Sequence, residues 1–371
     1  MLDDKSLCRR RYQIVGKMTE KRDIRKNNFN IIRMAACLFV FVGHMGRILG
    51  VEPPVFSGYV LHEMGVAILF MLAGYLVTES WLKDPNLLRY GIRRFFRLWP
   101  PFAVMVLIMT FIAGPLVSDL GISGYFQSWY SAYLNNLRLY ITYSLPGVFT
   151  DLPVANTVNG SLWTMPVEAA MYVISPLIAV MLHMRRRSER SFIAAIVLTA
   201  IILILDLYFI AFMRGTQIVI YHTDLISAHH LALSYITGAL FTYPQMKKIL
   251  NIQWACAGMG ILLLLARAPA PLLYLFMDLF VPYFIFSFAL VKEPAFHQFG
   301  RKADLSYGIY LYGFFFQQLT MQHMSRNDIS ASYISVLIIS FLPTFLAAIV
   351  SYFLVEKPLQ QFTRAIITRF S

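Results

Sequence analysis

Long apolar runs alternate with short polar segments along almost the whole chain. A helix of about 20 mainly apolar residues spans the hydrocarbon core of a bilayer, and ten runs reach or approach that length. They cover residues 29–49, 59–82, 95–117, 164–184, 192–213, 226–244, 251–266, 271–291, 303–323 and 332–355. The pattern predicts an all-α fold, a polytopic membrane helical bundle with about ten transmembrane helices.

Lysine and arginine gather in alternate connections between these runs. If the chain begins in the cytoplasm, 26 of the 32 basic residues fall in cytoplasmic segments. Because cytoplasmic loops are enriched in Lys and Arg, both termini are predicted to be cytoplasmic. The net charge of +13 then needs no nucleic acid as a partner, since the anionic lipids of the inner leaflet account for it.

Composition supports this class and divides the chain. Hydrophobic residues make up 58% and charged residues 14%, whereas a soluble domain has about 25% charged residues. Residues 1–28 are interpreted as a basic cytoplasmic arm, 29–356 as the membrane domain, and 357–371 as a cytoplasmic tail, with Pro358 stopping the last helix. The longest outside segment, 118–163, is rich in Tyr, Trp and Asn, which suit a sugar ligand. That assignment rests on composition alone.

Arg33 and His44 lie eleven positions apart in the first apolar run. Eleven positions are about three helical turns, so both side chains point to one face, separated by a rise of roughly 16 Å. Ionisable groups inside a membrane are costly unless they line a cavity or meet partners. This pair therefore indicates a function beyond anchoring.

A second basic patch contains Arg93, Arg94 and Arg97, at the predicted cytoplasmic start of the third span. Spacings of three and four residues gather these guanidiniums on one helix face. Guanidinium groups match phosphate oxygens and stay charged, so the patch suits a phosphorylated ligand from the cytoplasm. The alternative is a set of topology anchors, which basic residues at this depth often are.

The fourth apolar run is preceded by Trp163 and carries Glu168 near its start. Thr164, Glu168 and Tyr172 share one helical face. His44 and Glu168 both lie in the outer halves of their predicted spans, so we expect a base and the group that orients it to meet there. The alternative is an ordinary carboxylate in the first turn of a helix, with Trp163 at the membrane interface.

Further polar residues fall inside apolar runs. Asp206 and Asp278 are intramembrane acids, and each is either functional or paired with a polar neighbour. His229 and His230 are adjacent, so their side chains diverge by about 100°; with no third ligand in view, no metal site is expected. Three cysteines without ligand spacing give neither a disulfide framework nor a zinc site.

Six motifs occur in order along the chain: Arg33 with His44, then 65–76, 94–100, 161–168, 305–312 and 355–358. In this order they resemble the acyltransferase 3 family of integral-membrane O-acyltransferases. The resemblance implies a bacterial inner-membrane enzyme with ten spans. Such an enzyme takes an acyl group, usually acetyl, from cytoplasmic acyl-CoA and places it on a hydroxyl, commonly of a sugar in a cell-surface or secreted glycan. No tightly bound cofactor is implied.

The resemblance also suggests roles for individual residues. His44 would be the catalytic histidine and Arg33 the arginine paired with it. Arg94 and Arg97, with Arg93 beside them, would bind the acyl donor at the cytoplasmic side. Glu168 would be the acid of the motif that contains Trp163. Trp163, Tyr172, Ser306 and Tyr310 are acceptor-site or packing residues. One departure is Gly313, which stands where many members have a histidine.

The chemistry of a sugar hydroxyl agrees with these roles. Such a hydroxyl needs a base within hydrogen-bond reach as it attacks an acyl carbon, and histidine is the usual one. His44 would act in this way, or would carry the acyl group as a covalent intermediate. A transporter or exporter of a glycan or small polar substrate, and a membrane sensor, are the alternatives. The sequence leaves open the acceptor, the acyl length, the side of transfer and the oligomeric state.

Overall fold

A computed structural model describes residues 26–369 of the chain. Apart from two short β-hairpins, the regular elements in this range are helices, which confirms the predicted all-α class. The elements are α2 (Phe29–Leu49), β1 (Val55–Phe56), β2 (Tyr59–Val60), α3 (Leu61–Lys83), α4 (Leu87–Ile108), η1 (Met109–Ala113), α5 (Gly114–Val117), α6 (Gly121–Gln127), η2 (Tyr130–Arg138), α7 (Thr164–Met181), η3 (Met184–Arg186), α8 (Glu189–Phe212), β3 (Val219–Ile220), β4 (Thr223–Asp224), α9 (Leu225–Leu240), α10 (Pro244–Lys248), α11 (Ile252–Leu264), α12 (Ala270–Ala289), α13 (Ser306–Arg326), α14 (Tyr333–Ser351), η4 (Tyr352–Glu356) and α15 (Lys357–Arg369).

Each of the ten predicted apolar runs coincides with a helix, and seven of these helices in the described range are long and apolar enough to cross a membrane. The other three are α9 and α11, which are shorter, and α13, which carries buried glutamines such as Gln317 and Gln318. Those amides donate hydrogen bonds to backbone carbonyls, Gln317 to Phe41 and Gln318 to Val154. These bonds satisfy the two amide nitrogens inside the bundle, whereas the Oε1 atoms of both glutamines are buried without a hydrogen-bond partner among the described residues.

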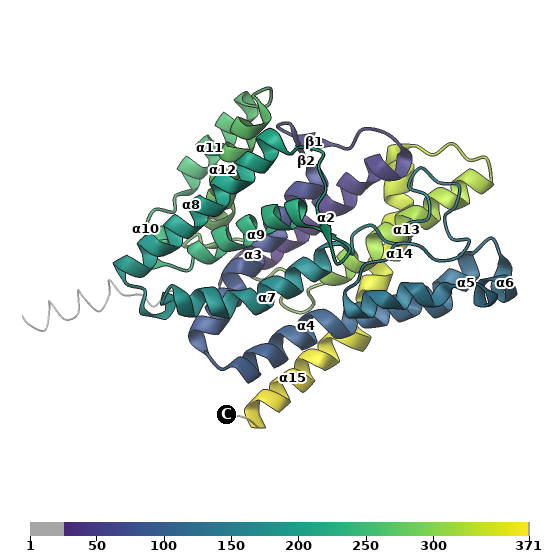
Figure 1. The fold of residues 1–371 in the computed structure, drawn as a ribbon, viewed down its shortest axis with the longest axis horizontal. Coiled ribbons are helices and arrows are strands. Elements are labelled where there is room, and N and C mark those ends of the chain that lie inside the picture. Colours follow the sequence, from purple (N-terminus) through teal and green to yellow (C-terminus); the bar gives the residue numbers. More distant parts are fainter. Residues whose placement is uncertain (1–25, 370–371) are drawn as a thin grey trace, which may run out of the picture.

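Helices α2 and α3 lie at the centre of the bundle (Figure 1). Helix α3 packs against α2 and α9, and α13 packs against α2 and α14, while α8, α11 and α12 form a group beside α9. The closest crossing is between α3 and α9. A Cβ on Gly74 would lie 1.8 Å from the Tyr235 carbonyl oxygen, and one on Gly238 would lie 1.9 Å from that of Met71. Glycine at both positions lets these two backbones touch, as small residues do between membrane helices.

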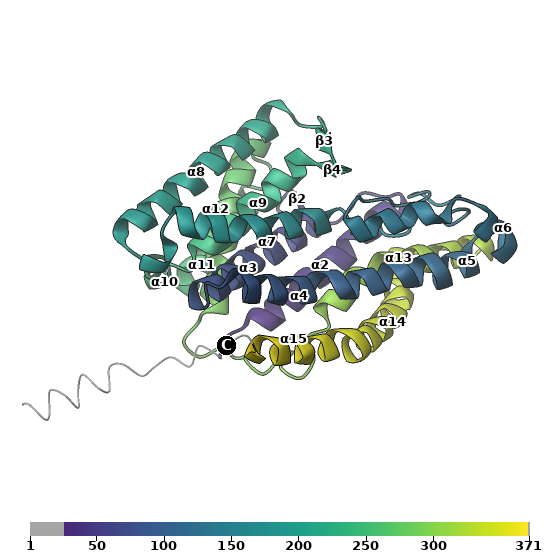
Figure 2. The ribbon, with the colours of Figure 1, turned by 60° about the horizontal axis from the view of Figure 1, so that its bottom comes forward.

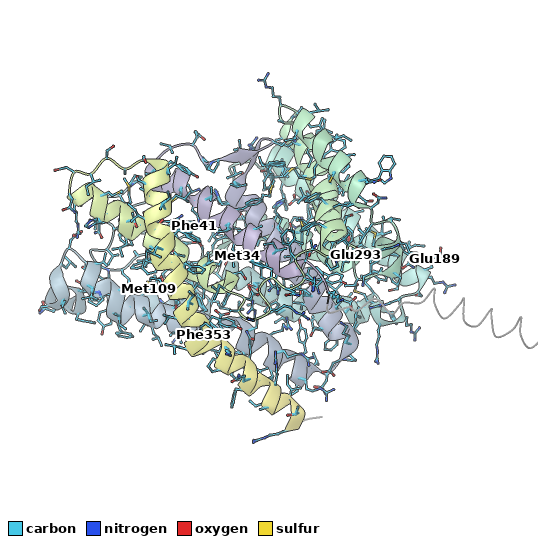
Figure 3. The ribbon with its side chains drawn as sticks, turned by 180° about the vertical axis from the view of Figure 1, so that it is seen from behind. Met34, Phe41, Met109, Glu189, Glu293 and Phe353 are labelled. Carbon is cyan, nitrogen blue, oxygen red and sulfur yellow. The ribbon has the colours of Figure 1, made fainter. Side chains whose placement is uncertain are left out.

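The last helix does not stop at Pro358, so that expectation was wrong. Helix α14 continues through the π-helical turn η4 into α15, and Figure 3 shows one continuous, bent helix past Phe353. Pro358 is the second residue of α15, a position where a missing N–H is tolerated because the π turn already interrupts the regular ladder. Helix α15 then packs along α4 (Figure 2).

The outer segment 118–163 folds into a small layer of its own with α6 and η2. Tyr125, Tyr133 and Asn136 are buried in it, and Asn136 hydrogen-bonds the Thr142 backbone. These three residues hold the segment together and are not displayed to a ligand. Of the aromatic residues expected to form a sugar platform, Trp129 is the well-exposed one, at 83%.

Candidate active site

Three cavities follow one another through the bundle. The basic cavity, about 450 Å³, is lined by six arginines, two acids and residues of α15: Arg33, Arg93, Arg94, Arg97, Arg301, Arg364, Asp304, Glu356, Gln360 and Thr363 among others. The central cavity, about 130 Å³, is lined among others by Arg33, Cys37, Val66, Arg94, Arg97, Thr164, Glu168, Tyr172, Ser306, Tyr307 and Tyr310. The acidic cavity, about 350 Å³, is lined among others by Tyr59, Glu63, Val66, Trp163, Asp206, Arg214, Asp224, His230 and Tyr274.

Shared side chains join these cavities in series. Arg33, Arg94 and Arg97 line both the basic and the central cavity. Val66 lines both the central and the acidic cavity. Arginines therefore form one boundary of the central cavity, and a single aliphatic side chain forms part of the other.

Arg33 and Arg97 are held by acids at the wall of the basic cavity. Arg33 pairs with Asp304, and Arg97 lies 3.9 Å from Asp304 and 3.5 Å from Glu356. Burial would raise the pKa of Asp304, but the Arg33 and Arg97 guanidiniums and hydrogen bonds from Ser306 bring it below its usual range. Sequence reasoning missed Asp304; its signal was an acid at the start of the predicted ninth span, directly after the basic residues Arg301 and Lys302.

Arg93 and Arg94 differ in their surroundings although they are adjacent. Arg93 donates a 2.8 Å hydrogen bond to Asp84, the residue that follows α3. Arg94 pairs with no carboxylate among the described residues; its guanidinium lies over the rings of Tyr90 and Tyr172, at 5.8 and 5.6 Å. Arg94 is thus the member of the predicted donor set that forms no salt bridge within the described bundle, although its charge acts on Glu168, which lines the same central cavity.

Glu168 lies in the central cavity and not beside His44. It accepts a hydrogen bond from Tyr172, and it shares the cavity with Arg94 and Arg97. No contact joins Glu168 to His44 in the part of the chain that the structure describes, so the predicted meeting of base and acid is not found.

The reason lies in the residues before α7. Asn159 and Ser161 are buried, Asn159 bonds the Leu311 carbonyl at 2.7 Å, and Tyr310 donates to the Ser161 carbonyl at 3.1 Å. The chain has already entered the bundle at this point. Helix α7 therefore begins inside the bundle. Glu168 lies deeper than predicted from its distance to the outer end of the fourth apolar run.

His44 is 7% exposed and packs against His62 and Phe314, with ring centroids 5.0 and 5.2 Å away. Helices α2 and α3 are in close contact here, since a Cβ on Gly43 would lie 2.4 Å from the His62 backbone nitrogen. Residues four apart on a helix are neighbours, so His62 lies one turn from Val66, where the central and acidic cavities meet. Sequence reasoning singled out His44 but not His62 as its partner.

The acceptor-site or packing candidates fall into two cavities. Tyr172, Ser306 and Tyr310 line the central cavity, and Trp163 lines the acidic one. Tyr310 also shares a 2.6 Å hydrogen bond with Thr164. The predicted common face of Thr164, Glu168 and Tyr172 is confirmed, because all three line the central cavity.

Fold and site together define a polytopic helical membrane protein with a charged path through its interior. Residues 26–353 match the acyltransferase domain family, and the chain belongs to this family of acyltransferases. It is 23% identical over 250 residues to nodulation protein 10 of Rhizobium leguminosarum bv. viciae, covering 65% of this chain and 63% of that protein. It is 20% identical over 335 residues to an O-acetyl transferase of Shigella phage Sf6, covering 90% of this chain and 96% of the phage protein. No solved structure shows a significant match.

Proposed function

We propose that this protein moves an acyl group, acetyl in the simplest case, from cytoplasmic acyl-CoA to a hydroxyl of a cell-surface or secreted glycan at the bacterial inner membrane. Its membership of the acyltransferase family and its similarity to an O-acetyl transferase support the class of reaction. The observation that carries the donor assignment is the basic cavity, whose arginines continue into the central cavity. Guanidinium groups bind phosphate oxygens in bidentate geometry, as the phosphates of CoA require.

In this proposal the phosphates of acyl-CoA bind in the basic cavity and the thioester enters the central cavity past Arg94 and Arg97. Arg33, held by Asp304, lies on the same wall and stabilises negative charge that develops on the thioester oxygen. The acceptor approaches from the acidic cavity, which Val66 separates from the central one.

His44 takes the proton from the acceptor hydroxyl as its oxygen attacks the acyl carbon. The carbon–sulfur bond then breaks, and CoA leaves as a thiol once it receives that proton. In the alternative route the imidazole is acylated first and the hydroxyl displaces it. Either route requires the Phe314 ring, which packs on His44, to turn aside and expose the imidazole.

The test is the ester itself. Cells that make the glycan and express the wild-type chain should carry a mass increment of one acyl group, removed by mild base and detected by mass spectrometry. His44→Ala should lack it at equal membrane abundance, while His183→Ala, which changes an exposed histidine outside the cavities, should keep it. Full esterification with His44→Ala would reject the role of His44, and an absence of ester with the wild type would reject the glycan as acceptor.

A further inference from the structure

Three potential metal ligands from three different helices meet at the acidic cavity. Asp206 of α8, His230 of α9 and Asp278 of α12 each offer one ligand atom, and these atoms all lie within 4.8 Å of one another. His229, the neighbour of His230, points elsewhere and hydrogen-bonds the Ile202 carbonyl. The expected divergence of the two histidines is therefore present, but the partners that sequence reasoning lacked come from α8 and α12.

The contacts around His230 resemble those of a metal-binding imidazole. Its Nδ1 lies 2.9 Å from Asp206 Oδ2, and its Nε2 lies 2.6 Å from the Tyr59 hydroxyl. A histidine that binds a metal through one nitrogen usually has its other nitrogen fixed by an outer partner, which sets the tautomer. Tyr59 fills that position.

Asp278 supplies an independent sign that a ligand is missing. Its Oδ2 is fully buried and has no hydrogen-bond partner among the described residues. The charges that act on Asp278 are those of His230 and Asp206, whereas Arg214, also in the acidic cavity, acts on Glu63. One imidazole can balance only one of the two aspartates, and an uncompensated carboxylate inside a membrane helix is costly.

We propose that Asp206, His230 and Asp278 bind one divalent transition-metal cation, for which Zn²⁺ is the probe. Two carboxylates and a neutral imidazole balance its charge, and this ligand type suits zinc or manganese. Ligands at about 2.0–2.2 Å from zinc lie roughly 3–4 Å from each other, so closure requires only small side-chain movements. Asp206 and His230 line the acidic cavity, which leaves a further coordination position facing that space.

The experiment uses the full chain in detergent, purified with a tag that contains no histidine and stripped with a chelator. Calorimetric titration with Zn²⁺, repeated with Mn²⁺, should give one tight site, and bound metal should raise the melting temperature. Asp278→Asn should weaken this binding more than tenfold. Tyr59→Phe, which removes only the outer partner, should weaken it roughly 10- to 100-fold.

His229→Gln is the matched control, because it removes an imidazole one residue away that lies outside the cluster. It should bind metal as the wild type does. Asp278→Asn should melt no lower than the metal-free wild type, since it removes an unpaired buried charge, so its loss of binding cannot be ascribed to unfolding. If Asp278→Asn does misfold, Tyr59→Phe decides the question alone.

Three outcomes overturn the proposal: no tight site for either ion, a tight site that neither Asp278→Asn nor Tyr59→Phe weakens, or equal weakening by His229→Gln. The measurement involves no acyl transfer. Its failure would leave the proposed acyltransferase function untouched, and the failure of that function would leave the metal site standing.

Discussion

Replacing Arg94 by glutamine should weaken acyl-CoA binding while leaving the fold intact. Arg94 lines both the basic and the central cavity, and its guanidinium pairs with no carboxylate in the described part of the chain. Its charge is therefore available to a phosphate. A hydrogen bond to a charged group contributes about 1.5–3 kcal/mol, which corresponds to a rise in Kd of roughly 10- to 150-fold.

The same substitution at Arg97 should act differently because Arg97 also neutralises protein acids. Glu356 lies 3.5 Å from Arg97, and both of its carboxylate oxygens are buried without a hydrogen-bond partner among the described residues. Arg97→Gln leaves this carboxylate unpaired, at a cost to stability of about 3 kcal/mol or more. Arg94→Gln should melt close to the wild-type temperature, whereas Arg97→Gln should melt well below it.

The assay is calorimetric titration of CoA and of acetyl-CoA into protein in lipid nanodiscs, with the melting temperature measured on the same samples. Arg89→Gln is the matched control, because Arg89 lies on α4 too but hydrogen-bonds Asp84 and lines neither the basic nor the central cavity. Unchanged affinity in Arg94→Gln would refute the donor site. So would an equal loss of affinity in Arg89→Gln, since that would indicate a general effect of surface charge.

Three further substitutions test the fold and the path. Asp304→Asn should be less stable than the wild type near neutral pH. Because the folded-state pKa of Asp304 is lowered, the carboxylate contributes stability above about pH 4, and this contribution is lost as the pH falls through the folded-state pKa. The melting temperatures of wild type and variant should therefore converge in acid. Gly74→Ala places a Cβ 1.8 Å from the Tyr235 carbonyl oxygen and should destabilise the protein by about 1–3 kcal/mol or more in thermal unfolding, whereas Gly91→Ala, with no atom within 4 Å, should not. Val66→Trp should leave CoA affinity near the wild-type value but reduce ester formation roughly tenfold or more; normal ester yield would contradict a path past Val66.

Local patterns were sufficient to predict the helices. The lengths of the apolar runs and the positions of the basic residues between them predicted ten helices, and a helix occupies each predicted run. The prediction failed at Pro358 because proline, which ends an ordinary α-helix, is tolerated just after a π turn. The π turn depends on how α14 and α15 pack, and the sequence pattern holds no information on that packing.

The predicted common face of one helix, α7, is confirmed, whereas the predicted contact between two helices is not found among the residues that the structure describes. Thr164, Glu168 and Tyr172 share a face as periodicity requires. The pairing of His44 with Glu168 failed because depth was counted from helix ends, while the buried residues Asn159 and Ser161 shift the start of α7 inward. The partners of His230 could not be found from spacing either, since its cluster is assembled from α8, α9 and α12.

The order of the cavities gives the proposed reaction a direction. The basic cavity holds six arginines against two acids, and the acidic cavity holds three carboxylates against one arginine in its lining. Charges inside a low-dielectric bundle interact strongly, so an anionic donor is stabilised at the basic end and repelled at the other. With both termini in the cytoplasm, as the positive-inside rule predicts, the basic end faces the cytoplasm. An anionic thioester would then enter from the cytoplasm only. A hydroxyl acceptor, which carries no such charge, would be free to approach from the opposite end. In this proposal the acyl group crosses the boundary near Val66, beside the packed rings of His44 and His62.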